Sequence, residues 1–128
     1  MKLHTFVVYL AGCFFLFYGL AFSVVPNFMS ELVTGTTVDN ISALVDFRAT
    51  YGGMTVSVGL VILYLYKTDQ VRLSLLSIIV VLLGMAAART AGFVVDGATN
   101  QLMYVYLVLE LLGSALAWLA LQTLVTHK

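Results

Sequence analysis

The stretch LSLLSIIVVLLGMAAARTAGFVV, Leu73–Val95, decides the fold because it is long and apolar enough to cross a lipid bilayer as a helix. A spanning α-helix needs about 20 predominantly apolar residues, and this run exceeds that length. Its one ionisable side chain belongs to Arg89, whose guanidinium stays charged and is costly to place in hydrocarbon. What Arg89 faces is therefore the central question about function.

The composition of the whole chain indicates an integral membrane protein. Hydrophobic residues make up 62% of the 128 residues and charged residues only 9%, whereas about a quarter of a soluble domain is charged. So few charges do not cover a soluble surface. The net charge of zero argues against nucleic acid as a partner.

Further apolar runs predict an all-α fold: an integral membrane, antiparallel four-helix bundle that forms one domain over residues 1–128. The predicted spanning helices are Thr5–Val25, Phe47–Tyr66, Leu73–Val95 and Leu102–Val125. Short polar turns at Lys67–Arg72 and Asp96–Gln101 force their neighbours to run antiparallel.

Two segments outside this simple pattern need their own interpretation. The long connection Pro26–Val45 contains the amphipathic stretch NFMSELV, which predicts a short helix lying at the membrane interface. The first apolar run exceeds the hydrophobic region of a signal peptide, so we expect it to be retained as a helix.

Basic residues near helix ends predict the orientation, because they favour the cytoplasmic side. We expect both termini inside, N-in and C-in. The residues then on the cytoplasmic side include Lys2, Lys67, Arg72, His127 and Lys128. The acidic residues then outside are Glu31, Asp39 and Asp96.

Three ionisable residues from three predicted helices lie at a similar depth in the outer half of the membrane. With a rise of about 1.5 Å per residue, Arg89 lies about 10 Å inward from Asp96, and Glu110 lies about 12 Å inward from the start of its helix. Arg48 opens the second helix from the same side, next to Asp46. A shared level predicts that Arg48, Arg89 and Glu110 converge on one polar site.

Small and polar residues mark the helix faces that we expect to pack together. Tyr106, Glu110 and Gly113 recur at spacings of three and four, which places them on one face of the last helix. Small residues let helix backbones approach closely in lipid. The predicted packing residues are Gly52, Gly53, Gly84, Ala88, Gly92 and Gly113.

The predicted site suits an amphiphilic ligand with an anionic or carbonyl-bearing headgroup, such as a lipid, a quinone or a fatty acid. Arg48, Arg89 and Glu110 would bind the headgroup, with Tyr51 and Tyr106 lining the site. Alternatively, Arg89 and Glu110 form only an interhelical clasp, Arg48 extends to the headgroups, and each tyrosine belongs to the interfacial aromatic belt.

The leading function is therefore non-enzymatic: binding a small amphiphile, or acting as an accessory subunit. Membrane lipid, a small amphiphile, and a protein partner or second copy are the expected partners. No catalytic set, cofactor motif or metal site is predicted, because His4 and His127 lie at opposite ends and Cys13 is the only cysteine. The second possibility is a membrane enzyme or quinone-reactive subunit that uses Glu110 as acid and base. The third is a purely structural partner that packs through a track of small residues, Gly84, Ala88 and Gly92.

Three motifs carry a family resemblance: DFRATYGGMTVSVGL, GMAAARTAGFVVDG and YLVLELLGSALAWL. With them the chain resembles a family of small bacterial four-helix membrane proteins of unknown function, distantly similar to the DoxX-like group. The positions that match are Arg48, Tyr51, Gly52, Gly53, Arg89, Gly92 and Glu110. The resemblance implies the four-helix fold and a multi-pass location in the inner membrane of a bacterium, and it brings no established activity.

Overall fold

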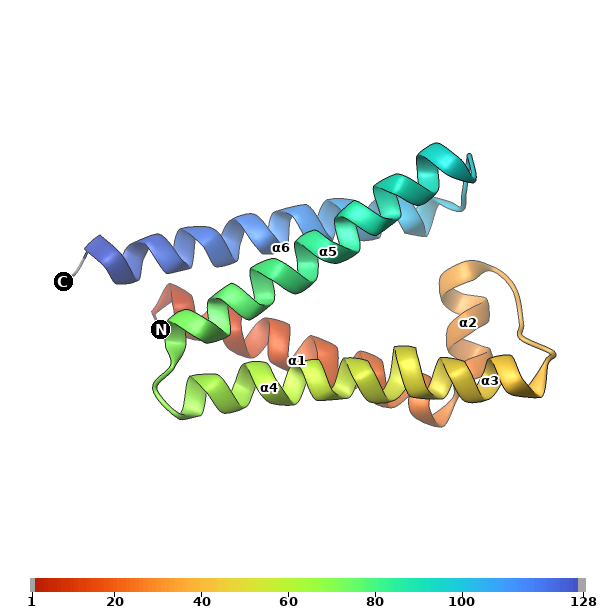
Figure 1. The fold of residues 1–128 in the computed structure, drawn as a ribbon, viewed down its shortest axis with the longest axis horizontal. Helices are drawn as coiled ribbons and strands as arrows, with labels where there is room; N and C mark the ends of the chain where they lie inside the picture. Colours follow the sequence, from red (N-terminus) through yellow and green to blue (C-terminus); the bar gives the residue numbers. More distant parts are fainter. Residues whose placement is uncertain (1, 127–128) are drawn as a thin grey trace.

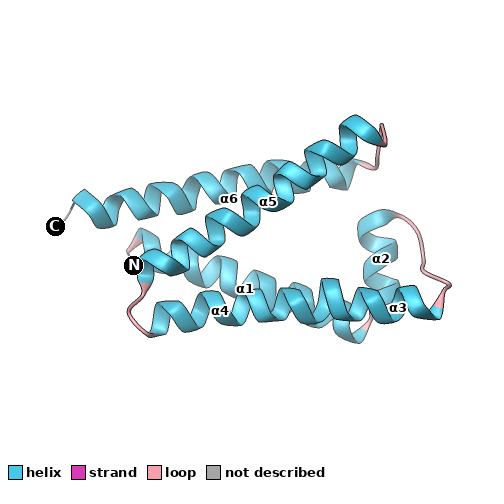
Figure 2. Ribbon diagram, viewed as in Figure 1, coloured by secondary structure: helices cyan, strands magenta, loops and turns pink. Residues whose placement is uncertain are grey.

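The computed structural model describes residues 2–126, and these residues form helices and loops without a strand (Figure 2). Its helices are α1 (Leu3–Val24), α2 (Pro26–Thr34), α3 (Ile41–Phe47), the π-helix η1 (Arg48–Met54), α4 (Thr55–Lys67), α5 (Val71–Val95) and α6 (Gln101–Thr126). Four helical stretches are long and apolar enough to span a membrane: Leu3–Val24, Ile41–Lys67, Val71–Val95 and Gln101–Leu124. The predicted all-α fold with four membrane-length helices is confirmed.

The second membrane-length helix begins at Ile41, earlier than the predicted Phe47. Asn40 is the reason, because its side-chain oxygen accepts a hydrogen bond from the backbone N–H of Ala43 at 3.2 Å. Such a bond satisfies one of the free donors in the first turn and lets a helix start there. The helix therefore runs on through α3, η1 and α4 without a break.

The long helices alternate in direction and associate in two pairs (Figure 1). α1 packs along η1 and α4, and α5 packs along α6, with fewer contacts between the pairs. The start of α1, the turn between α4 and α5 and the end of α6 lie at the same end of the molecule. We call this the amino-terminal end, and the end that holds α2 the opposite end.

Glycines bring α1 and α4 into close backbone contact. A Cβ atom added at Gly59 would lie 2.8 Å from the carbonyl oxygen of Gly12 and 2.9 Å from the backbone nitrogen of Leu16. One added at Gly19 would lie 2.7 Å from the backbone nitrogen of Val56. The two helices therefore touch at a separation that only glycine permits at these positions.

The glycines singled out from the sequence divide into two groups. Gly52 is buried against Ser23, and a Cβ at Gly113 would lie 2.9 Å from Leu82 Cδ1, so both lie at helix contacts. The predicted packing role needs correction for the remaining four residues, which are Gly53, Gly84, Ala88 and Gly92. No other helix lies within 4 Å of the Cβ position of the three glycines, and Ala88 is exposed. The small-residue track of α5 faces away from the rest of the chain.

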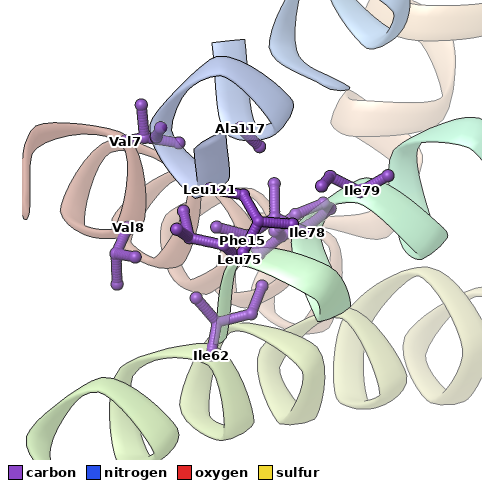
Figure 3. Packing of buried hydrophobic residues seen from close by; sticks show 10 residues of the cluster. Val7, Val8, Phe15, Ile62, Leu75, Ile78, Ile79, Ala117 and Leu121 are labelled. Atoms are coloured by element: carbon purple, nitrogen blue, oxygen red, sulfur yellow. The ribbon is translucent and has the colours of Figure 1, made fainter. Parts of the chain in front are cut away.

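An apolar core joins all four long helices toward the amino-terminal end (Figure 3). Ser74 lies within this core, and its hydroxyl donates to the carbonyl oxygen of Ile62 at 2.9 Å, linking α5 to α4. The buried apolar residues are Val7, Val8, Phe15, Ile62, Leu75, Ile78, Ile79, Ala117, Ala120 and Leu121. Burying such side chains together fixes the pairs relative to each other.

The predicted short helix in the long connection is present as α2. Pro26 occupies its first turn, and Gly35 ends it with a φ of 82°, a conformation that suits glycine. Met29 and Val33 pack inward in a second apolar cluster that includes Met103 and Tyr106 of α6. α2 thus packs against the first turns of α6, and its position at a membrane interface stays a prediction.

Candidate functional site

Arg89 of α5 and Glu110 of α6 form an ion pair between neighbouring helices. Arg89 Nη2 donates to Glu110 Oε1 at 2.7 Å, and Arg89 Nε lies 3.2 Å from both carboxylate oxygens. The side chains are 18% and 5% exposed respectively. These charge-assisted bonds give the buried carboxylate of Glu110 a cationic partner. The predicted convergence therefore occurs for these two residues.

Two residues of α6 complete the surroundings of the guanidinium. Arg89 Nη1 lies 2.9 Å from the sulfur of Met103, and Arg89 Cζ lies 5.4 Å from the centre of the Tyr106 ring. Met103, Tyr106 and Glu110 are spaced by three and four residues, so α6 presents all three on one face. The cation therefore rests against a thioether and an aromatic ring as well as a carboxylate.

Met103 is the residue that the sequence analysis missed. It lies one turn before Tyr106 on the stripe that contains Glu110, so the helical spacing contained the signal. A methionine in a membrane helix is ordinarily an apolar filler, and nothing in its residue type predicts a contact with a guanidinium.

Arg48 does not join this pair, which corrects the prediction of one site with three charges. Its Nη1 donates to the carbonyl oxygen of Ser23 and, at 3.3 Å, to that of Val24. The last carbonyls of a helix lack intrahelical donors, and a positive charge is favourable there. Arg48 therefore caps the end of α1, and within residues 2–126 no ion pair or hydrogen bond connects it to Glu110.

Tyr51 also lies away from the guanidinium. It stacks on Phe22 at a ring-centre distance of 5.3 Å and on Phe47 at 4.9 Å. Phe22 contacts Tyr18, whose ring meets Tyr106 edge-on at 6.4 Å. Of the two tyrosines predicted to line the site, only Tyr106 contacts Arg89, and Tyr51 connects to it through a chain of aromatic rings.

The segment that carries Arg48 and Tyr51 is a π-helix, which the sequence analysis did not predict. η1 covers RATYGGM, and Gly52 within it lies on Ser23 of α1. π-helical turns are rare and often occur at functional sites. Here the wide turn places Arg48 at the end of α1 and Tyr51 on the Phe22 ring.

Two open apolar grooves lie on the surface of the bundle. One, of about 500 Å³, runs between α4 and α5 and includes Ser57 and Ser77 in its lining. The other, of about 670 Å³, lies along α5 and includes Ala87, Thr90 and Leu111. Neither groove is lined by Arg89 or Glu110, so these grooves do not form the predicted headgroup site.

No group of three or more His, Cys, Asp or Glu side chains is arranged to hold a metal ion within the part of the chain that the structure describes. His127 and Lys128 of the predicted inner set lie outside that part. The candidate site therefore consists of Arg89, Glu110, Met103 and Tyr106, with Tyr18 packed behind Tyr106.

Fold and site together define an all-helical protein with four helices long and apolar enough to span a membrane, the last two joined by the ion pair of Arg89 and Glu110. The chain belongs to the DUF4345 family, a domain of unknown function whose pattern matches residues 3–121. No curated protein and no solved structure matches it significantly. Membership of a family without known activity agrees with the resemblance, whereas the distant similarity to the DoxX-like group stays a prediction.

Proposed function

We propose that this is a multi-pass protein of the bacterial inner membrane that binds an amphiphile through Arg89, with both chain ends on the cytoplasmic side. The orientation rests on the basic residues, because Lys2, Lys67 and Arg72 all lie at the amino-terminal end of the bundle. The resemblance to small bacterial membrane proteins supports the location. Ligand binding rests on the hydrogen-bonding capacity of Arg89.

The observation that carries the proposal is the sulfur atom opposite Arg89 Nη1. A guanidinium has five N–H donors in a fixed fork. Glu110 takes those of Nε and one of Nη2, while Nη1 meets only the thioether of Met103, a weak acceptor. Within residues 2–126, no oxygen accepts from Nη1 of Arg89.

A guanidinium donor that meets only a weak acceptor is costly in a membrane, because hydrocarbon offers no oxygen in place of water. The Arg89 side chain is more exposed than that of Glu110, 18% against 5%, so it is the accessible member of the pair. An amphiphile whose headgroup oxygen reaches Nη1 would satisfy these donors while its tail stays among the apolar side chains. The shared acceptor is an oxygen atom, which lipids, fatty acids and quinones all supply.

Native mass spectrometry of the protein released from detergent tests this function. Arg89→Lys keeps the positive charge beside Glu110 but removes the planar fork, so we expect the bound amphiphile of the native protein to be lost. Arg48→Lys is the matched control, because it makes the same change at the end of α1, and it should retain the amphiphile. A native protein without bound amphiphile, or an Arg89→Lys variant that retains as much, contradicts the proposal.

A structural role in a membrane complex is the second candidate, favoured by the outward placement of the α5 track. Among residues 2–126, no atom beyond the neighbouring backbone of α5 lies within 4 Å of the Gly84 Cβ position, and Ala88 is exposed. A partner helix would approach closely along such a surface. Gly84→Leu should then release a co-purifying protein or a second copy in crosslinking experiments, without changing the unfolding of the isolated chain. An unchanged crosslinking pattern refutes this candidate.

A further inference from the structure

We infer that the ligand of the Arg89 site is electrically neutral and presents a carbonyl oxygen, as in an ester or a quinone, in preference to a phosphate or carboxylate. The inference rests on the proposed function and narrows its ligand class. It follows from the charge of Glu110 beside Arg89 and from the position of Arg48 at the end of α1.

The site has no net charge. Arg89 and Glu110 contribute one positive and one negative charge, held together by bonds of 2.7 and 3.2 Å. Arg48, the second cation predicted for the site, donates instead through Nη1 to the carbonyl oxygens at the end of α1. The remaining contacts of the guanidinium, Met103 and Tyr106, are uncharged.

A second anion at this place would meet two obstacles. It would lie near the Glu110 carboxylate, and like charges repel strongly where the surroundings have a low dielectric constant. To bind Arg89 through the full fork, it would have to displace Glu110, whose side chain is 5% exposed and would be left buried without a partner.

A carbonyl oxygen meets neither obstacle. It adds no charge, and it needs only the donors on Nη1 that now face the Met103 sulfur. Tyr106 lies against the guanidinium and Tyr18 lies against Tyr106. The neighbouring side chains are therefore aromatic and suit an apolar or ring-bearing group. Charge and lining both favour a neutral ligand.

The same reasoning predicts that Glu110 sets the ligand preference. Glu110→Gln would leave the charge of Arg89 without its counterion, and the site would become cationic. A phosphate headgroup would then be favoured over a neutral one. Glu31→Gln is the matched control, because it removes one exposed carboxylate of α2 that forms no ion pair with Arg89 within residues 2–126.

The experiment compares diacylglycerol with phosphatidic acid carrying the same acyl chains, added to detergent-purified protein and measured by native mass spectrometry. The two lipids differ only in the phosphate. We expect the native protein and Glu31→Gln to retain diacylglycerol several-fold more than phosphatidic acid, and Glu110→Gln to reverse that order. An alkylated benzoquinone in a third arm separates a quinone carbonyl from an ester carbonyl.

The Met103 position gives an independent comparison that leaves the ion pair intact. Met103→Gln places an amide oxygen beside Nη1, so we expect it to reduce retention of the neutral probes several-fold, whereas Met103→Leu should retain them. A native protein that retains phosphatidic acid as well as diacylglycerol overturns the inference and leaves amphiphile binding standing. A native protein that binds no probe and carries no native amphiphile overturns the proposed function itself.

Discussion

Gly59→Ala should destabilise the bundle, because its new methyl group would meet backbone atoms of α1 that cannot rotate away. The Cβ atom would lie 2.8 Å from the Gly12 oxygen and 2.9 Å from the Leu16 nitrogen, whereas ordinary contact begins at 3.4 Å. The helices must therefore separate by about 0.6 Å, the difference between 3.4 and 2.8 Å. Overpacking of this kind costs about 1–3 kcal/mol.

Gly84→Ala is the matched control on α5. Its methyl group meets no atom of the other described helices within 4 Å, and alanine favours a helix over glycine by about 1 kcal/mol. SDS titration in mixed micelles, followed by circular dichroism, measures both variants. We expect Gly59→Ala to unfold at lower SDS fraction than the native protein and Gly84→Ala at an equal or higher one.

Equal unfolding midpoints for the two alanine variants would refute the close approach of α1 and α4. Gly19→Ala provides a second test, since its Cβ would lie 2.7 Å from the Val56 backbone nitrogen. It should lower stability as Gly59→Ala does. Stability above the native level in both α1–α4 variants would mean that the helices are farther apart than described.

Three further substitutions test single contacts. Ser74→Ala removes the buried hydrogen bond from α5 to α4 and should lower the free energy of unfolding by about 1 kcal/mol. The hydroxyl of Ser77 bonds within its own helix, so Ser77→Ala should change that free energy little in the same SDS titration. Arg48→Gln removes the charged cap of α1, so hydrogen exchange should accelerate at the last turn of that helix, and unchanged exchange would contradict the capping role. Asn100→Ala removes the 3.0 Å hydrogen bond from the Asn100 side chain to the last turn of α2. Hydrogen exchange over residues 26–34 should therefore accelerate while α5 stays protected. Protection of α2 equal to that in the native protein would refute the role of this bond.

The sequence predicts the helices and the central ion pair for sound physical reasons. Apolar length specifies a spanning helix, and the cost of isolated charges in hydrocarbon requires Arg89 to find a partner. Glu110 was available on the next helix, across a short turn. Because the charge of Arg89 needs a partner and Glu110 is the one carboxylate at a similar depth on the next helix, residue spacing is enough to predict this ion pair.

The position of Arg48 shows what depth along a helix leaves undetermined. Residues at one level lie anywhere around the bundle, and Arg48 also had the free carbonyls of α1 within reach. Small-residue tracks have a similar ambiguity, since they permit a close approach without naming the partner. The close contact formed at Gly59 of α4, while Gly84 of α5 remained open. The early start of the second long helix depends on the cap formed by Asn40, a residue within the predicted connection Pro26–Val45.

The placement of both charges in α5 and α6 has a consequence for biogenesis. Arg89 and Glu110 are separated by one short turn, and the ion pair draws no atom from α1 or α4. In the membrane location proposed above, α5 and α6 would therefore neutralise the charges of Arg89 and Glu110 within one helical hairpin. Insertion of this hairpin would then not depend on earlier pairing with α1 and α4.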